Sequence, residues 1–177
     1  MGIDPGVANT GFGVVRLAGG RMSAVDGGVI EAPPGKPLET RLARIHAELE
    51  QLIAWHQPAA VAIEDLFFGK NLRSAVAVGQ ARGIAMLAAA QHGAPCFDYT
   101  PQAVKLAVCG TGSAAKRQVQ QMVGALLGLP RPPESDHAAD ALAVAICHAA
   151  QVRPTATGAD STTVVGGQSQ PAAAVSP

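Results

Sequence analysis

Three acidic residues stand where an apolar segment ends or is interrupted. Asp4 follows three apolar or small residues, Glu64 follows the apolar run 59–63, and Asp140 lies inside the apolar helical pattern 138–146. A buried ionised carboxylate needs a positive partner or a metal, because its desolvation is very unfavourable. Few basic residues lie near these acids in the sequence, and hard oxygen ligands suit Mg²⁺ or Mn²⁺. We therefore predict a divalent cation site.

His137 adds a nitrogen donor to this set. It precedes Asp140 by three residues, so both side chains lie on one face of a helix and can reach one metal pair. Two cations about 3.5–4 Å apart can activate water and stabilise the leaving oxygen of a phosphodiester. Shared carboxylate ligands hold two ions that close together. The predicted chemistry is therefore phosphodiester hydrolysis.

Each of these residues also has a plainer interpretation. Asp4 could belong only to a turn, because the proline and glycine that follow it are turn formers. Glu64 could be exposed at an edge of the sheet, Asp140 could pair with an arginine or cap a helix, and His137 could simply pack on its helix. The conjunction favours the functional interpretation, because the carboxyl ends of strands cluster at one rim of an open α/β sheet.

The charge distribution indicates a polyanionic partner, although the net charge is zero. Residues 69–131 carry a net charge of +6, whereas 1–68 and 132–177 each carry −3. A polyanion could bind the basic middle and be cut at the acidic flanks. The alternative is a chance asymmetry on a solvated surface.

Two loops carry possible nucleic-acid contacts. Phe67 and Phe68 follow Glu64 closely and precede Lys70 and Arg73, so they could stack on or wedge between bases. A core position for one phenylalanine is the alternative. The segment 110–113 (Gly-Thr-Gly-Ser) precedes Lys116 and could bind a phosphate at a helix N-terminus, although it does not match the P-loop pattern.

Residues 1–153 are predicted to form one α/β domain, and residues 154–177 a disordered low-complexity tail. The three cysteines are widely spaced and form no Cys-x-x-Cys pair, which favours a reduced compartment. No apolar run reaches the length of a membrane span, and no signal peptide is recognisable. We expect a cytoplasmic protein.

The predicted elements alternate between strands and helices. An antiparallel meander is expected first, with glycines for tight packing in its second strand, followed by helix-linked parallel strands. The predicted strands are 2–4, 10–17, 22–31, 59–64 and 95–99. The predicted helices are 38–56, 72–92, 101–109, 114–127 and 135–150, with Asn71 and Ser113 as N-caps of the second and fourth.

Five sequence motifs together resemble one known family. They are GIDPG with TGFGV (2–6 and 10–14), AIEDLFFGKN (62–71), SAVAVGQARG (74–83), VKLAVCGTGSAAK (104–116) and HAADALAVA (137–145). In order and spacing they are similar to the RuvC family of bacterial Holliday-junction resolvases, in the ribonuclease H-like superfamily. The resemblance covers about residues 1–150. It implies a mixed sheet flanked by helices.

The resemblance also implies roles for individual residues. Asp4, Glu64 and Asp140 would form the acidic site with His137 and hold two Mg²⁺ or Mn²⁺ ions per subunit. His137 could bind one metal, favour Mn²⁺, or position or deprotonate the water. Other positions of the family correspond to contacts with DNA: the backbone-phosphate contacts Lys105, Lys116 and Arg117, and the junction-probing aromatics Phe67 and Phe68.

A homodimer is implied as well, cutting two like-polarity strands of a four-way DNA junction, with RuvA and RuvB as branch-migration partners. The helix near 74–88 would lie at the dimer interface. Only three residues precede Asp4, fewer than family members usually carry, so the first strand is expected to be short or the native start to lie upstream. The alternatives are a non-catalytic junction-binding module, an actin-like ATPase and a related nuclease acting on RNA.

Overall fold

The sheet of this protein has five strands. A computed structural model describes residues 1–65 and 72–152. The strands are β1 (Gly2–Asp4), β2 (Asn9–Ala18), β3 (Arg21–Glu31), β4 (Val61–Glu64) and β5 (Cys96–Tyr99). Their order is β3-β2-β1-β4-β5. The pairs β1–β2 and β2–β3 are antiparallel, and β1–β4 and β4–β5 are parallel, which confirms the predicted mixed sheet.

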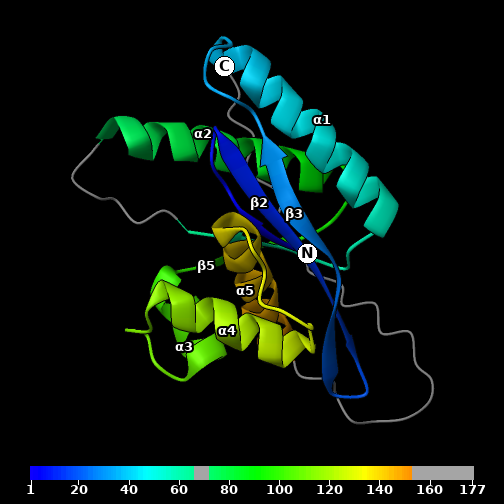
Figure 1. Ribbon diagram of the computed structural model, residues 1–177. Helices are drawn as coiled ribbons and strands as arrows, with labels where there is room; N and C mark the ends of the chain where they lie inside the picture. The colour runs from blue at the N-terminus through cyan, green and yellow to red at the C-terminus, as the bar shows by residue number, and fades with distance from the viewer. Residues whose placement is uncertain (66–71, 153–177) are drawn as a thin grey trace, which may run out of the picture.

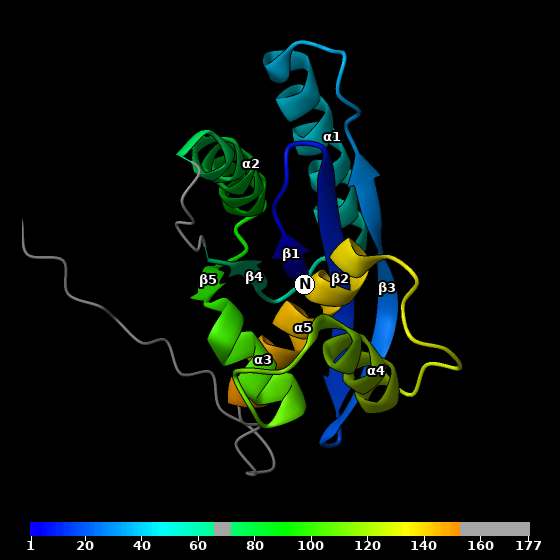
Figure 2. The same ribbon diagram turned by 60° about the vertical axis from the view of Figure 1, so that its left-hand side comes forward.

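Helices cover both faces of this sheet. They are α1 (Leu38–His56), α2 (Leu72–Gln91), α3 (Pro101–Cys109), α4 (Lys116–Leu127) and α5 (Asp136–Gln151). Figures 1 and 2 show α1 and α2 on one side, with α3, α4 and α5 on the other. Each side has its own apolar cluster, so the domain is a three-layer α/β/α structure.

Alternation along the central strands divides the side chains between these two clusters. Ile3, Val61 and Ile63 pack with α1 and α2, whereas Ala62 packs with α5 and its neighbours. Successive side chains of a strand point to opposite faces. Glu64 lies two residues after Ala62 on the same strand, so its side chain also points toward α5.

Glycines let α5 lie directly on β1 and β2. A Cβ atom at Gly2 or Gly11 would overlap backbone atoms of α5, the carbonyl oxygen of Ala141 in the first case and that of His137 in the second. A Cβ at Gly13 would lie 2.7 Å from the side chain of Leu142. The prediction that glycines serve tight packing here is confirmed.

Four of the five predicted helix starts agree with the structure to within one residue, and the start of α4 is wrong. α3 begins at Pro101, and α5 has Ser135 as its N-cap, whose hydroxyl accepts from the N–H of Ala138. The α4 helix begins at Lys116, not at residue 114, and Ser113 does not cap it. The Ser113 hydroxyl instead bonds to that of Thr111 (3.0 Å), because two neighbouring hydroxyls in a tight loop satisfy each other.

The first strand is short, which is one of the two outcomes expected from the few residues before Asp4. β1 is only three residues long, but it is paired on both sides, by β2 and β4. Within residues 1–65 and 72–152, no helix is both long and apolar enough to cross a membrane. Asn71 and the predicted tail 154–177 lie outside the described residues.

Candidate active site

Neighbouring parallel strands bring Asp4 and Glu64 together. The register pairs Gly2 with Ala62 and Ile3 with Ile63, so the next residue along each strand is Asp4 on β1 and Glu64 on β4. Gly2 and Ala62 face α5. Asp4 and Glu64 each lie two residues later on the same strand, so their side chains also point to the α5 side. Two carboxylates thus meet at the carboxyl ends of adjacent central strands.

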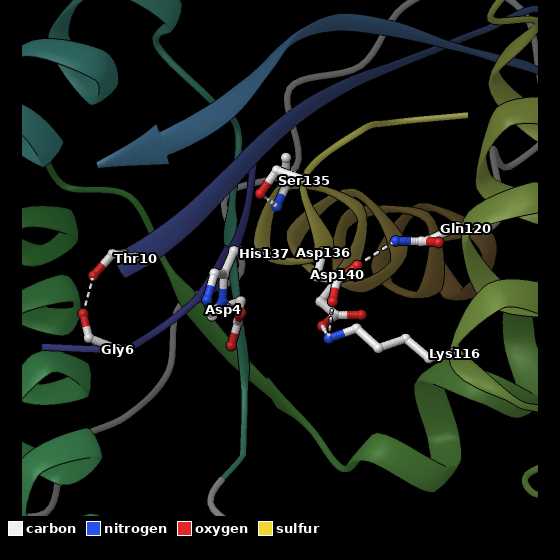
Figure 3. Close-up of polar contacts among 10 residues, drawn as sticks. Asp4, Gly6, Thr10, Lys116, Gln120, Ser135, Asp136, His137 and Asp140 are labelled. Atoms are coloured by element: carbon white, nitrogen blue, oxygen red, sulfur yellow. Dashed lines mark hydrogen bonds and ion pairs between the residues drawn. The ribbon is translucent and has the colours of Figure 1, made fainter. Parts of the chain in front are cut away.

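The first turns of α5 supply the imidazole and the third carboxylate. Nδ1 of His137 lies 2.8 Å from Oδ2 of Asp4 (Figure 3). An ionised carboxylate only accepts hydrogen bonds, so the ring nitrogen donates here. Nε2 of a neutral ring then remains free to bind a metal or a proton. Asp140 follows one turn later on the same helix.

Asp140 has a cationic partner from α4. Nζ of Lys116 lies 3.3 Å from Oδ2 of Asp140 and 3.1 Å from Oδ2 of Asp136 (Figure 3). A basic residue that is distant in the sequence therefore lies beside one of the three acids in space. Lys116 is distant from Asp140 in sequence, and the packing of α4 against α5 brings it there. The structure pairs this predicted phosphate contact with carboxylates.

The electrostatics of the cluster favour a bound proton or cation. The pKa of Glu64 is raised to about 8, chiefly by burial and then by the negative charges of Asp4 and Asp140 and a hydrogen bond with Asp4, against the opposing charge of Lys116. Burial also raises the pKa of Asp140, against the opposing charge of Lys116. The pKa of Lys116 is raised, because its contacts with Asp136 and Asp140 outweigh its own partial burial. A pKa raised this far favours a proton on Glu64 near neutral pH when no cation is bound.

The donor set suits hard divalent cations, although its side chains now bind one another. Three carboxylates and one imidazole lie at a single edge of the sheet, and such ligands suit Mg²⁺ and Mn²⁺. No three His, Cys, Asp or Glu side chains within residues 1–65 and 72–152 already form a ligating group. An ion bound here would compete with the proton on Glu64 and with Lys116 for Asp140. The metal site remains a prediction.

A small pocket beside the cluster gathers two of the predicted DNA contacts. Its volume is about 160 Å³, and Glu64 and Asp140 line it together with Lys105 and Lys116. Its apolar walls are Pro101, Val104 and Val119. A phosphate entering here would meet two ammonium groups beside the carboxylates.

The other predicted DNA contacts are not brought to this pocket. Arg117 is exposed on α4 and does not line it. Phe67, Phe68 and Lys70 lie outside the described residues, as does the side chain of Arg73. The roles of these five residues remain predictions.

Sequence reasoning gave no role to a fourth carboxylate, Asp136, or to the amide of Gln120, which lie beside the site. Gln120 donates to Asp136, which in turn pairs with Lys116. The signal was present in the sequence as two i, i+4 pairs, Lys116 with Gln120 and Asp136 with Asp140, because residues four apart share a helix face. Only the contact between the two helices joins the pairs.

Gly11→Ala is expected to lower both stability and activity, because the added methyl would overlap the His137 carbonyl group and push α5 off the sheet. Overpacking of this kind destabilises by about 1–3 kcal/mol. A displacement of about 1 Å at the site lowers a rate by roughly 10²-fold. Thermal unfolding and a DNA cleavage assay measure the two effects.

The control for this substitution is Gly27→Ala on β3. A Cβ there would lie 3.3 Å from Cδ1 of Leu142 and at ordinary contact distances from Cγ of Leu142 and the carbonyl oxygen of Phe12, so it would overlap no backbone atom. Equal losses in the two variants would contradict the proposal that the approach of α5 to Gly11 positions the site.

This chain is similar in sequence and in fold to proteins of one family. The family model for the crossover junction endodeoxyribonuclease RuvC matches residues 1–148. The RuvC of Pelotomaculum thermopropionicum is 54% identical over 149 residues, covering 84% of this chain and 91% of that protein. The RuvC of Chloroflexus aggregans is 52% identical over 149 residues, which again cover 84% of this chain and 91% of that protein.

A solved structure agrees with these sequences. T. thermophilus RuvC in complex with a Holliday junction substrate superposes with a TM-score of 0.82 at 40% identity, covering 86% of this chain and 93% of that one. The sequence match extends through every described element except the last residues of α5. The chain therefore belongs to the RuvC family of crossover junction endodeoxyribonucleases.

Proposed function

We propose that this protein is a structure-selective endonuclease that resolves four-way (Holliday) DNA junctions in recombination and repair. One observation carries the proposal: Asp4, Glu64 and Asp140 converge at one edge of the sheet, where Lys105 and Lys116 line the adjoining pocket. This arrangement suits a phosphodiester and its metal ions. The junction-bound T. thermophilus relative supports the choice of substrate.

Four side chains would hold the metal ions. Asp4, Glu64, Asp140 and His137 would bind two Mg²⁺ or Mn²⁺ ions per subunit. When bound, such ions would activate water and stabilise the leaving oxygen. Asp4 orients the His137 ring through the 2.8 Å hydrogen bond, so that Nε2 can serve as a ligand or a base.

The two lysines would hold the DNA backbone at the site. Lys105 and Lys116 reach the pocket from α3 and α4, and their charges would attract a phosphate toward Glu64 and Asp140. Attack by water in line would leave 5′-phosphate and 3′-hydroxyl ends, which can be ligated. This outcome is required for the rejoining of a resolved junction.

Resolution needs two cuts, so the functional unit would be a homodimer with one site per subunit. The two sites would make paired, symmetric nicks in strands of like polarity. The branch-migration proteins RuvA and RuvB are the partners expected to present the junction. Support for these assemblies comes from membership of the family.

Cleavage of a synthetic four-way junction is expected only with Mg²⁺ or Mn²⁺, as paired symmetric nicks resolved on a denaturing gel. Duplex and single-stranded DNA of the same sequence serve as substrate controls, and excess chelator removes the metal. Cutting that persists in chelator, or equal cutting of duplex and junction, would contradict the proposal. Junction binding without cutting would favour the non-catalytic module, and nucleotide hydrolysis without cutting would favour the ATPase.

A further inference from the structure

Two helix faces meet beside the acidic cluster and share one ammonium group. Lys116 and Gln120 lie one turn apart on α4, and Asp136 and Asp140 lie one turn apart on α5. Nζ of Lys116 is 3.1 Å from Oδ2 of Asp136 and 3.3 Å from Oδ2 of Asp140 (Figure 3). Lys116 is therefore held between a carboxylate of the site and one outside it.

Asp136 is fixed in place by a second contact. Nε2 of Gln120 donates to its Oδ1 at 2.5 Å, while its Oδ2 faces Lys116. Each oxygen thus already has a partner. The carboxylate of Asp136 is 56% exposed and does not line the pocket, whereas that of Asp140 is 29% exposed and lines it. Asp136 is consequently placed to bind Lys116, not a metal ion inside the pocket.

A divalent ion and Lys116 compete for Asp140. A metal ion at the Asp140 carboxylate would lie within a few ångströms of the ammonium group, and like charges at that distance repel strongly in a partly buried site. Lys116 must therefore leave Asp140 when the ion binds. Asp136 can accept the whole ammonium group with little movement, because it is already in contact with it.

We infer that Asp136 is a positioning residue that draws Lys116 away from Asp140 when a divalent ion binds, and so strengthens metal binding. The inference rests on the proposed function, because it needs the metal site. Its second consequence is that Lys116 stays beside the pocket, where its charge remains available to the DNA phosphate.

A simpler alternative is that Asp136 attracts the ion by its negative charge alone. Both ideas predict that neutralising Asp136 weakens metal binding. They differ once Lys116 is absent. An effect exerted through Lys116 disappears in that background, whereas a direct effect of charge remains. A double-mutant cycle separates the two.

The experiment measures Mn²⁺ affinity by calorimetry, without DNA, in four proteins: the wild type, Asp136→Asn, Lys116→Met and the double variant. Asp136→Asn is expected to raise the dissociation constant about fivefold, within the range of couplings between contacting residues. The same change made in the Lys116→Met background is expected to alter it less than about twofold. Asparagine keeps an oxygen that can accept from Gln120, so the contact between the helices is retained.

Glu134→Gln is the matched control, because Glu134 is an exposed carboxylate two residues before α5 and its loss changes the net charge equally. Thermal unfolding of the metal-free proteins verifies that all variants fold. Equal weakening in both backgrounds, or no weakening by Asp136→Asn, would overturn the inference and leave the proposed function intact. A folded wild type that binds no Mn²⁺ would overturn the metal site and the inference together.

Discussion

Asp140→Asn is expected to lower the rate of junction cleavage by about 10³-fold or more, since a ligand carboxylate contributes to several kcal/mol of transition-state stabilisation by the metal. Asparagine has nearly the same shape but no charge, so it is a poor ligand for a hard cation. The substitution also removes the negative charge that attracts Lys116, whose Nζ lies 3.3 Å from Oδ2 of Asp140. Junction binding at low salt is therefore expected to persist, and Asp4→Asn is expected to behave likewise.

Single-turnover cleavage and a gel mobility shift on the same four-way junction measure the two quantities. Glu134→Gln is again the control, because it removes an exposed carboxylate of equal charge near α5 but outside the pocket. Full cleavage by Asp140→Asn would refute the mechanism. Loss of binding together with cleavage would point to a failure of folding, which thermal unfolding detects.

Glu64→Gln is expected to abolish cleavage and yet stabilise the metal-free protein at pH 8. The pKa of Glu64 is raised from 4.5 to about 8 in the folded protein. The folded state therefore keeps a proton that the unfolded chain releases, and the stability of the wild type falls as pH rises from 4.5 through about 8. Glutamine carries no ionisable proton, so the variant avoids this loss.

The expected gain at pH 8 is a few kcal/mol, or roughly 5–10 °C in melting temperature for a domain of this size. Thermal unfolding in chelator across pH 5–8.5, the range within which the effect is expected to develop, measures the difference between variant and wild type. Glu31→Gln, an exposed carboxylate at the end of β3, is the control and is expected to follow the wild type. Parallel stability curves for wild type and Glu64→Gln would show that burial does not raise the pKa of Glu64.

Added Mn²⁺ is expected to remove the difference by raising the melting temperature of the wild type alone. The ion takes the place of the proton on Glu64, so binding at pH 7 is accompanied by proton release. Calorimetry in two buffers of different ionisation enthalpy measures that release. Metal binding without proton release would contradict the role given to Glu64.

The elements that carry the carboxylates were predictable because their signals are local. The spacing of Ile45, Leu49 and Ile53 predicts α1, and the apolar run before Glu64 predicts β4, although β4 begins at Val61 and not at residue 59. Acidic residues at strand ends were correctly expected to meet, because parallel strands end at one rim of the sheet.

What was not predictable depends on contacts between distant segments. The pairing of Lys116 with Asp140 requires the packing of α4 on α5, which no local pattern encodes. The hydrogen bond between His137 and Asp4 likewise joins residues 133 positions apart. The wrong cap at Ser113 arose because a serine near a helix start was assigned by type, whereas its hydroxyl had a nearer partner in Thr111.

The close approach of α5 to the glycines of β1 and β2 has a consequence for how this protein can vary. At Gly2 and Gly11 the backbone of the sheet directly contacts the backbone of α5. The distance between sheet and helix therefore does not depend on the size of any side chain there. The opposite flank of α5 is covered by ordinary aliphatic packing from α3 and α4. Substitutions among those aliphatic residues can change the melting point while leaving the ligand geometry in place, which makes that flank the natural target for thermostabilising this nuclease.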